Sequence, residues 1–179
     1  MIDMWCRKVM NDEIEKWAQK LPHKQLKVLE VSGTEWKDFG FMSYTSLAFP
    51  AFDICKETTD DQFDLIFAEQ VFEHIEDPAA AANNILKMLK PGGVFLITTP
   101  FLIKYHPAPL DMWRWTKEAL KVFLEKQGYV QVETYSWGNK ECLIANLEDW
   151  PPYDEDRHSL DNDVDYPIMV WGFARKPKH

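Results

Sequence analysis

The sequence predicts an α/β fold built on a mostly parallel β-sheet, and the alternation of its segments carries that prediction. From Phe63 onward, short apolar runs of strand length alternate with segments in which apolar residues recur at helical spacing. Turn residues separate several of these segments, as in the Pro-Gly-Gly sequence of residues 91–93. Strands that alternate with helices pair in parallel through right-handed crossovers, so the pattern favours a sheet covered by helices.

The composition is that of one globular domain. The 179 residues are 46% hydrophobic, enough for one sizeable core, and we expect residues 1–179 to form a single domain. The formal net charge of −9 argues against nucleic acid and anionic membrane as partners, because both require clustered Lys and Arg. Cys6, Cys55 and Cys142 are widely spaced, which predicts neither a disulfide framework nor a zinc site. With no signal peptide or membrane-spanning stretch apparent, a cytoplasmic location is expected.

The N-terminal elements are predicted from short patterns. Residues 3–20 carry apolar side chains at helical spacing before Pro22, so residues 1–22 are expected to form an amphipathic helix that packs on the domain. Residues 26–31, LKVLEV, are a short buried strand. Two weaker strand patterns follow, at residues 42–49 and 51–55.

The central elements have clearer signals. Residues 63–68, FDLIFA, form an apolar strand. Asp77 and Pro78 supply an N-cap and a first-turn proline for a helix over residues 79–90, which the Pro-Gly-Gly sequence breaks. Residues 94–100, VFLITTP, form a second buried strand that opens into a long loop.

The C-terminal third begins with a capped helix. Thr116 can cap a helix over residues 117–127, and Gly128 stops it. The remaining segments are a strand over 129–137, a candidate helix over 140–150, an acidic loop over 151–165 and a last strand over 167–176. No clean crossover separates the last two strands, so this pair could close the sheet as an antiparallel edge.

Two segments resemble a known family. Residues 63–101, FDLIFAEQVFEHIEDPAAAANNILKMLKPGGVFLITTPF, resemble the central segment of class I S-adenosylmethionine-dependent methyltransferases, of the methyltransferase type 11-like group. Residues 106–129, HPAPLDMWRWTKEALKVFLEKQGY, resemble the continuation of that segment. The resemblance covers about residues 25–135 and implies a Rossmann-like sheet of seven strands, the last one antiparallel, with helices on both faces. It also implies S-adenosyl-L-methionine as the cofactor, bound across the strand ends.

The resemblance also assigns cofactor contacts. Within VLEVSGTEW, residues 28–36, Glu30 matches the acid of the first motif and Gly33 its one retained glycine, whereas Trp36 stands where a glycine is usual. No acid ends the second strand, so Thr45 or Ser46 is expected at the ribose. The cofactor-binding residues that the resemblance implies are Glu30, Ser32, Gly33, Trp36, Thr45, Asp53, Ile54, Glu69 and Gln70.

Catalytic candidates follow from the long loop after residue 100. His106 is the only histidine in that loop and would act as the base that helps an oxygen or nitrogen acceptor, with Asp111 orienting it or acting in its place. His74 matches the histidine of the family's Glu-His pair and would support the site first and transfer a proton second. Tyr105, Trp113 and Arg114 are candidates for substrate binding, although Asp111 and Arg114 could instead pair with each other and brace the loop. No metal site is predicted.

Three functions remain open on the sequence. The leading one is methyl transfer to an oxygen or nitrogen of a small metabolite or a glycan-type precursor. The second is a non-catalytic binding or regulatory subunit of the same fold, because the first motif is poor in glycine. The third, a nicotinamide-dependent oxidoreductase, fares worst because VSGTEW lacks the G-x-G-x-x-G spacing.

Overall fold

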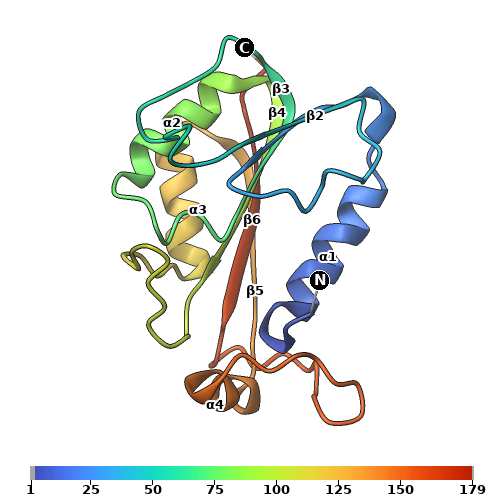
Figure 1. The fold of residues 1–179 in the computed structure, drawn as a ribbon, viewed down its shortest axis with the longest axis vertical. Coiled ribbons are helices and arrows are strands. Elements are labelled where there is room, and N and C mark those ends of the chain that lie inside the picture. Colours follow the sequence, from blue (N-terminus) through green and yellow to red (C-terminus); the bar gives the residue numbers. More distant parts are fainter. Residues whose placement is uncertain (1–2, 179) are drawn as a thin grey trace.

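A computed structural model of the chain describes residues 3–178, so residues 1, 2 and 179 of the predicted domain lie outside the described residues. The described part contains a six-stranded sheet in the order β2-β1-β3-β4-β6-β5 (Figure 1). The strands are β1 (Lys27–Val31), β2 (Ser43–Leu47), β3 (Phe63–Glu69), β4 (Leu89–Pro100), β5 (Val130–Trp137) and β6 (Met169–Arg175). The helices are α1 (Trp5–Gln19), α2 (Pro78–Met88), α3 (Lys117–Lys126), α4 (Lys140–Glu148) and the short 3-10 helix η1 (His23–Gln25).

The pairing confirms the predicted α/β sheet with an antiparallel last strand. β1 pairs in parallel with both β2 and β3, and β3 pairs in parallel with β4. β6 runs antiparallel to both of its neighbours, β4 and β5. The β5–β6 pair therefore closes one edge of the sheet, while β2 forms the other edge.

The expectation of seven strands is corrected to six, because the segment 51–55 forms a turn. The Asp53 carboxylate accepts the backbone N–H of Cys55, and the Asp53 carbonyl accepts the N–H groups of Lys56 and Glu57. Asp side chains that bind nearby backbone groups in this way favour turns over strands. The segment 51–55 therefore adds no strand to the sheet.

A second correction concerns the end of α2. The helix was expected to reach residue 90, but it ends at Met88, and β4 already begins at Leu89, which pairs with Phe63 of β3. Leu89 has extended backbone angles, φ −76° and ψ 140°, so Pro91, Gly92 and Gly93 lie inside the strand. The predicted caps are confirmed, because Asp77 accepts the N–H of Ala80 and Thr116 accepts that of Ala119.

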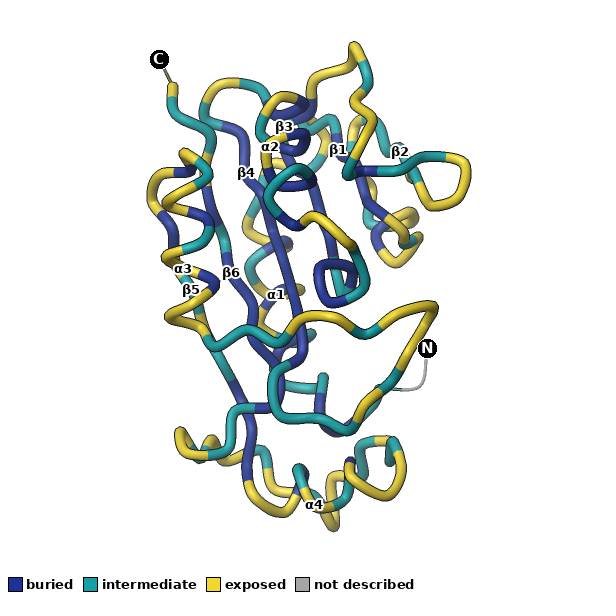
Figure 2. Tube along the Cα trace, turned by 90° about the vertical axis from the view of Figure 1, so that its left-hand side faces the viewer, coloured by how far each residue is buried: buried dark blue, intermediate teal, exposed yellow. Residues whose placement is uncertain are grey.

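The sheet has a core on each face. In Figure 1, α1 covers one face, while α2 and α3 cover the other. Successive residues of β3 divide between these cores: Leu65 and Phe67 pack in the cluster that contains α1, and Ile66 and Ala68 pack with α2 and α3. Figure 2 shows β4 as a buried strand in the middle of the sheet. The alternation places two apolar layers on one rigid platform.

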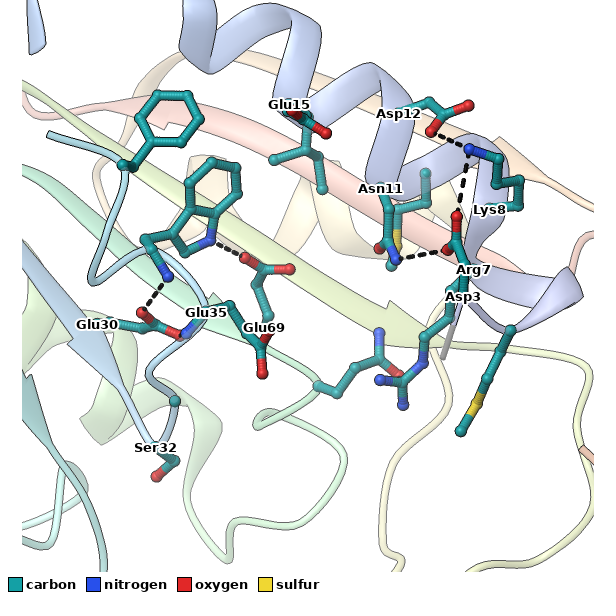
Figure 3. A pocket seen from close by; sticks show the side chains of 17 residues that line it. Asp3, Arg7, Lys8, Asn11, Asp12, Glu15, Glu30, Ser32, Glu35 and Glu69 are labelled. Atoms are coloured by element: carbon teal, nitrogen blue, oxygen red, sulfur yellow. Dashed lines mark hydrogen bonds and ion pairs between the residues drawn. The ribbon is translucent and has the colours of Figure 1, made fainter. Parts of the chain in front are cut away.

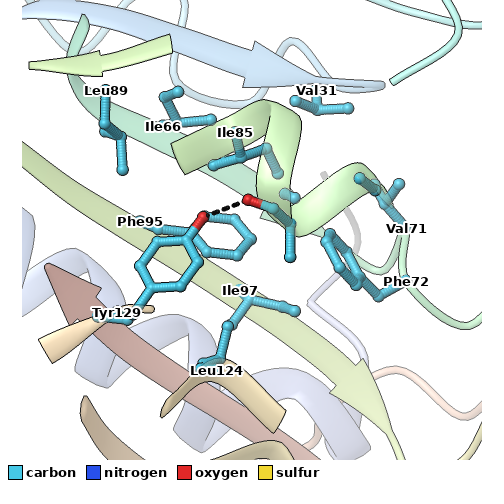
Figure 4. Close-up of a cluster of buried hydrophobic side chains, with 14 of the residues drawn as sticks. Val31, Ile66, Val71, Phe72, Ile85, Leu89, Phe95, Ile97, Leu124 and Tyr129 are labelled. Atoms are coloured by element: carbon cyan, nitrogen blue, oxygen red, sulfur yellow. Dashed lines mark hydrogen bonds between the residues drawn. The ribbon is translucent and has the colours of Figure 1, made fainter. Parts of the chain in front are cut away.

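The layer under α2 and α3 is closed by Tyr129 (Figure 4). Its buried hydroxyl donates to the Ala82 carbonyl of α2 at 2.8 Å, so the one polar atom of the ring is satisfied. Apolar layers thus pack on both faces of the parallel strands β1, β3 and β4. The carboxyl ends of these strands form the edge at which ligands bind in open parallel sheets. Among residues 3–178, no helix is long and apolar enough to cross a membrane.

Candidate active site

A pocket of about 690 Å³ opens at the carboxyl ends of β1 and β3, where α1 crosses the sheet. That volume lies within the range of about 300–1,000 Å³ typical of small-molecule sites. Figure 3 shows side chains of α1 on one side of the pocket and side chains of the strand ends on the other. Six of the nine predicted cofactor-binding residues line it, namely Glu30, Ser32, Gly33, Trp36, Glu69 and Gln70.

Glu30 organises the loop that follows β1. Its buried carboxylate accepts the backbone N–H groups of Glu35 at 3.0 Å and Trp36 at 3.1 Å, and the hydroxyl of Tyr44 at 2.6 Å. Burial and the Glu30 hydrogen bond raise the pKa of that hydroxyl well above its usual range, so Tyr44 remains a donor. Hydrogen bonds to a charged acceptor contribute about 1.5–3 kcal/mol each. Glu30 therefore fixes the shape of the loop from below.

Gly33 is required by this arrangement. A Cβ atom at Gly33 would lie 2.1 Å from Oε1 of Glu30, a distance at which two unbonded atoms overlap. The preceding residue, Ser32, has φ +60° in the left-handed region, where glycine is the residue with least strain. The loop thus performs a tight turn with a single glycine, because Ser32 accepts the strained angle.

Trp36 stands as a wall of the pocket and also as a donor. Its ring stacks on Phe67 at a centroid distance of 4.5 Å, and its Nε1–H donates to the carboxylate of Glu69. Burial raises the pKa of Glu69 to about 7, while the hydrogen bond from Trp36 opposes that rise. With a pKa near 7, the Glu69 carboxyl would be ionised at neutral pH when a cation binds beside it, because a nearby positive charge favours the carboxylate.

The charged face of α1 lines part of the pocket. The sequence alone did not predict this contribution. Arg7, Lys8, Asp12 and Glu15 line the pocket from α1, and the Arg7 guanidinium donates to the Gln70 side chain at 3.4 Å. The sequence signal was present, because charged residues alternate with the apolar face of this helix. A charged helix face is usually solvated, and only the packing of α1 beside β1 and β3 turns it toward a cavity.

The other three predicted cofactor-binding residues do not line this pocket. Thr45 lies in β2 beside Leu29 of β1. Asp53 caps the turn described above and pairs with Lys56 at 2.8 Å, which lowers the pKa of its carboxyl. Ile54 is 5% exposed and belongs to the core under α2. Ser46, the second ribose candidate, donates its hydroxyl to the Gly33 carbonyl at 2.6 Å.

His74 and His106 come together beyond the end of β3, with Glu73 beside them. The two imidazole rings lie 5.1 Å apart, edge to face, and the second ring also contacts Trp150. His74 Nε2 lies 3.6 Å from a carboxylate oxygen of Glu73. Burial lowers the pKa of His106, which keeps its imidazole neutral, and raises that of Glu73 to about 7.

The loop that carries His106 docks on the turn at Glu73. The Glu73 carbonyl accepts the N–H of Met112 at 2.8 Å and that of Trp113 at 3.3 Å. Asp111 and Arg114 form an ion pair, as expected if these two residues pair with each other and brace the loop. The Asp111 carboxylate also accepts the backbone N–H of His106 at 2.9 Å. Asp111 therefore holds the backbone of His106 and does not contact its imidazole through this bond.

The two remaining substrate candidates lie on the same loop near its surface. The Trp113 Nε1–H donates to the Ile75 carbonyl at 2.9 Å, and its ring is 41% exposed. Tyr105 is 70% exposed. The ring of Trp113 is thus fixed at one end, with the rest open to a ligand or to solvent.

Comparisons with known proteins agree with this architecture. The family model described as "Methyltransferase domain" matches residues 6–158. A segment of 83 residues is 30% identical to phosphoethanolamine N-methyltransferase 3 of Arabidopsis thaliana, covering 46% of this chain and 15% of that protein. Another of 48 residues is 40% identical to a probable S-adenosylmethionine-dependent methyltransferase of Mycolicibacterium smegmatis, covering 27% of this chain and 19% of that protein. The matches therefore span less than a fifth of either curated relative.

Solved structures show the same fold. Phosphoethanolamine N-methyltransferase 2 of Haemonchus contortus, in complex with phosphomonomethylethanolamine and S-adenosylhomocysteine, superposes with a TM-score of 0.64 at 16% identity, over 99% of this chain and 54% of that one. An S-adenosylmethionine-dependent methyltransferase of Mesorhizobium loti superposes with a TM-score of 0.61 at 16% identity, over 95% and 97% of the two chains. With the family model matching most of its length, the chain belongs to the methyltransferase-domain family of S-adenosylmethionine-dependent methyltransferases.

Proposed function

We propose that this chain transfers a methyl group from S-adenosyl-L-methionine to a nitrogen or oxygen atom of a small metabolite or a glycan-type precursor. The observation that carries the proposal is the pocket between α1 and the ends of β1 and β3, which the variant first motif lines. S-adenosyl-L-methionine would supply an electrophilic methyl group on a cationic sulfonium.

The charges of the pocket fit such a cofactor. Its lining contains six carboxylates, Asp3, Asp12, Glu15, Glu30, Glu35 and Glu69, and two cations, Arg7 and Lys8. The excess of acids favours a cationic ligand. Arg7 suits the carboxylate of an amino-acid portion, because its buried Nε has no hydrogen-bond partner in the described part of the chain. Glu69 would face the cationic groups, and Trp36 would add an aromatic wall, a contact worth about 0.5–2 kcal/mol.

His106 is the proposed base for the acceptor. It is neutral near pH 7, as a base must be, since burial lowers its pKa. His74 and Glu73 would hold it from the side of β3, and the Asp111–Arg114 pair would fix the loop that carries it. Trp113, Tyr105 and Arg114 would contact the acceptor from the same loop.

An amine acceptor is consistent with the relatives. The named enzymes of Arabidopsis thaliana and Haemonchus contortus are phosphoethanolamine N-methyltransferases. An amine that is protonated in water must lose a proton before it attacks, which gives His106 a task. The acidic pocket would also attract a cationic acceptor.

Calorimetric titration with S-adenosylhomocysteine tests the cofactor site. We expect binding, together with a rise in the melting temperature, and Arg7→Gln should weaken that binding. His106→Ala should lower turnover and leave the dissociation constant for S-adenosylhomocysteine nearly unchanged. No binding at millimolar S-adenosylhomocysteine would sink the proposal.

A second candidate is a non-catalytic subunit of the same fold. This candidate is favoured because polar groups near the first motif already have hydrogen-bond partners within the protein. Glu30 accepts a backbone N–H of its own loop, and the Ser46 hydroxyl donates to the Gly33 carbonyl. Cofactor binding without turnover on broad panels of amine, hydroxyl and sugar acceptors would support this candidate over the first.

A further inference from the structure

We propose that Glu73, His74 and His106 form a binding site for one divalent transition-metal ion of the zinc or manganese class. These residues lie beyond the pocket described above, on the turn after β3 and on the loop that follows β4. Each offers one ligand atom, and the three atoms lie within 4.8 Å of one another. The set is one carboxylate and two imidazoles, a combination that binds Zn²⁺, Mn²⁺ or Fe²⁺.

The carboxylate of Glu73 requires a partner. The residue is 0% exposed, and within residues 3–178 neither of its carboxylate oxygens has a hydrogen-bond partner. Burying an ionised carboxylate without compensation costs several kcal/mol, so such groups in proteins are paired, coordinate a metal or take up a proton. A cation placed between Glu73 and the imidazoles would satisfy the carboxylate directly.

The tautomer of His74 is the one that ligation needs. Its Nδ1 contacts the Leu110 carbonyl, and because a carbonyl only accepts hydrogen bonds, Nδ1 carries the proton. Nε2 then bears the lone pair and faces Glu73 Oε1 at 3.6 Å. Histidines that ligate metals commonly donate the other ring N–H to a carbonyl or carboxylate in this manner. Two lone-pair atoms that face each other in a buried site repel unless a proton or a cation lies between them.

The third ligand is brought in by the loop. The bonds from Met112 and Trp113 to the Glu73 carbonyl fasten the loop over the turn, and Asp111 holds the backbone of His106. Ligand atoms of a tetrahedral Zn²⁺ ion lie about 3.4 Å apart, given a bond length of about 2.1 Å. Ligand atoms that lie up to 4.8 Å apart would therefore close by about 1.4 Å around the ion, a movement that rotation of the His106 side chain on its loop would supply.

The site has a chemical consequence that rests on the proposed function. An ion with three protein ligands keeps at least one open position, and an acceptor hydroxyl or amine bound there would lose its proton more readily. The ion would then take over the task assigned above to the free His106 imidazole. Metal binding itself does not depend on that function.

The experiment titrates the metal-free full chain with Zn²⁺, Mn²⁺ and Mg²⁺ by calorimetry, with Mn²⁺ also followed by electron paramagnetic resonance. We expect one Zn²⁺ or Mn²⁺ per chain, bound at least tenfold more tightly than Mg²⁺. Glu73→Gln and His106→Asn should each weaken binding at least tenfold. The control is His158→Asn, which alters a histidine that lies in the acidic loop and stacks on Trp5, and it should retain binding.

The results of these titrations distinguish a real metal site from its absence. The proposal is overturned if neither Zn²⁺ nor Mn²⁺ binds, or if both site variants bind the ion as tightly as wild type. If Glu73→Gln does not fold, His106→Asn decides alone, because that side chain lies on a surface loop. S-adenosylhomocysteine binding, measured in the presence of a chelator, reports on the cofactor pocket separately, so failure of the metal site and failure of the proposed function are distinguishable.

Discussion

The carboxylate of Glu30 occupies the space that a side chain at Gly33 would need, with Oε1 only 2.1 Å from the position of an added Cβ. The two residues are three positions apart in the first motif, and the chain after Gly33 closes on the acid through the backbone N–H groups of Glu35 and Trp36. The glycine of this loop thus stands where a Cβ atom would overlap the carboxylate.

Replacing Gly33 by Ala should displace the Glu30 carboxylate and loosen the loop. We expect the affinity for S-adenosylhomocysteine to fall at least about tenfold, which corresponds to about 1.4 kcal/mol, as measured by calorimetry. The double variant Glu30→Ala/Gly33→Ala is the test of cause. If the contact with Glu30 is responsible, the double variant binds no more weakly than Glu30→Ala alone, whereas additive losses would point to another role for Gly33.

The ionisation of Glu69 makes stability depend on pH. Burial raises its pKa in the folded protein to about 7, above the ordinary value of 4.5, so the native state holds a proton that the unfolded state has released between these values. Stability from this group is complete below about pH 4.5 and is lost as the pH rises through about 7. Glu69→Gln should remove this loss, which we expect to be on the order of 3 kcal/mol, because each pKa unit corresponds to about 1.4 kcal/mol.

Urea unfolding at about pH 5 and about pH 8 measures that difference. Wild type should lose more stability than Glu69→Gln between the two conditions, since the glutamine stays neutral at both. The control is Glu118→Gln on α3, where the carboxylate is 71% exposed. It should leave the pH dependence of wild type unchanged, and an equal effect of the two variants would contradict the assignment to Glu69.

Arg7 should contribute to cofactor affinity from the helix α1. Its Nε is buried without a partner among the described residues, and its terminal nitrogen contacts Gln70, so a ligand carboxylate would complete its hydrogen bonds. Arg7→Gln should weaken S-adenosylhomocysteine binding about five- to tenfold by calorimetry. Lys16→Gln, on an exposed turn of the same helix, is the matched control. Equal affinities of the two variants would remove Arg7 from the site.

Local patterns predicted the elements well, and the site less well. The strand at Phe63, the Asp77 cap and the antiparallel last strand depend on short stretches of sequence and were confirmed. The seventh strand was wrong, because a single Asp at position 53 turned an apolar segment into a bonded turn. The number of strands in this region depended on the hydrogen bond between the Asp53 carboxylate and the backbone N–H of Cys55. The spacing of apolar residues along the sequence does not predict such a contact.

The site contacts are long-range, which explains what was missed. Tyr44 reaches Glu30 from the neighbouring strand, and Arg7 reaches Gln70 across 63 positions of sequence. The grouping of Glu73 with His106 depends on how the loop docks on the turn after β3. The Glu-His pair of residues 73 and 74 was a visible signal, but only the fold shows that a second histidine joins it.

The Asp111–Arg114 pair should control the loop and leave the cofactor pocket intact. Both terminal nitrogens of the Arg114 guanidinium contact the Asp111 carboxylate, whose pKa the arginine lowers to about 2, and the Asp111 side chain is 1% exposed. Asp111→Asn would leave a partly buried guanidinium with a neutral partner. We expect faster proteolysis within residues 101–115 and at least a tenfold fall in kcat/KM for the acceptor, with S-adenosylhomocysteine affinity unchanged. Arg114→Lys should not preserve activity, because an ammonium cannot form the two-pronged contact.

The chain contains a matched control for this pair. Asp154 and Arg157 have the same residue types and the same spacing, but they lie in the acidic loop with side chains 42% and 79% exposed. Exposed pairs contribute about 0–1 kcal/mol, so Asp154→Asn should change neither proteolysis of residues 101–115 nor kcat/KM. If Asp111→Asn behaves like Asp154→Asn, the pair does not brace the loop. A parallel loss of S-adenosylhomocysteine binding in Asp111→Asn would instead extend its influence to the pocket beside β1.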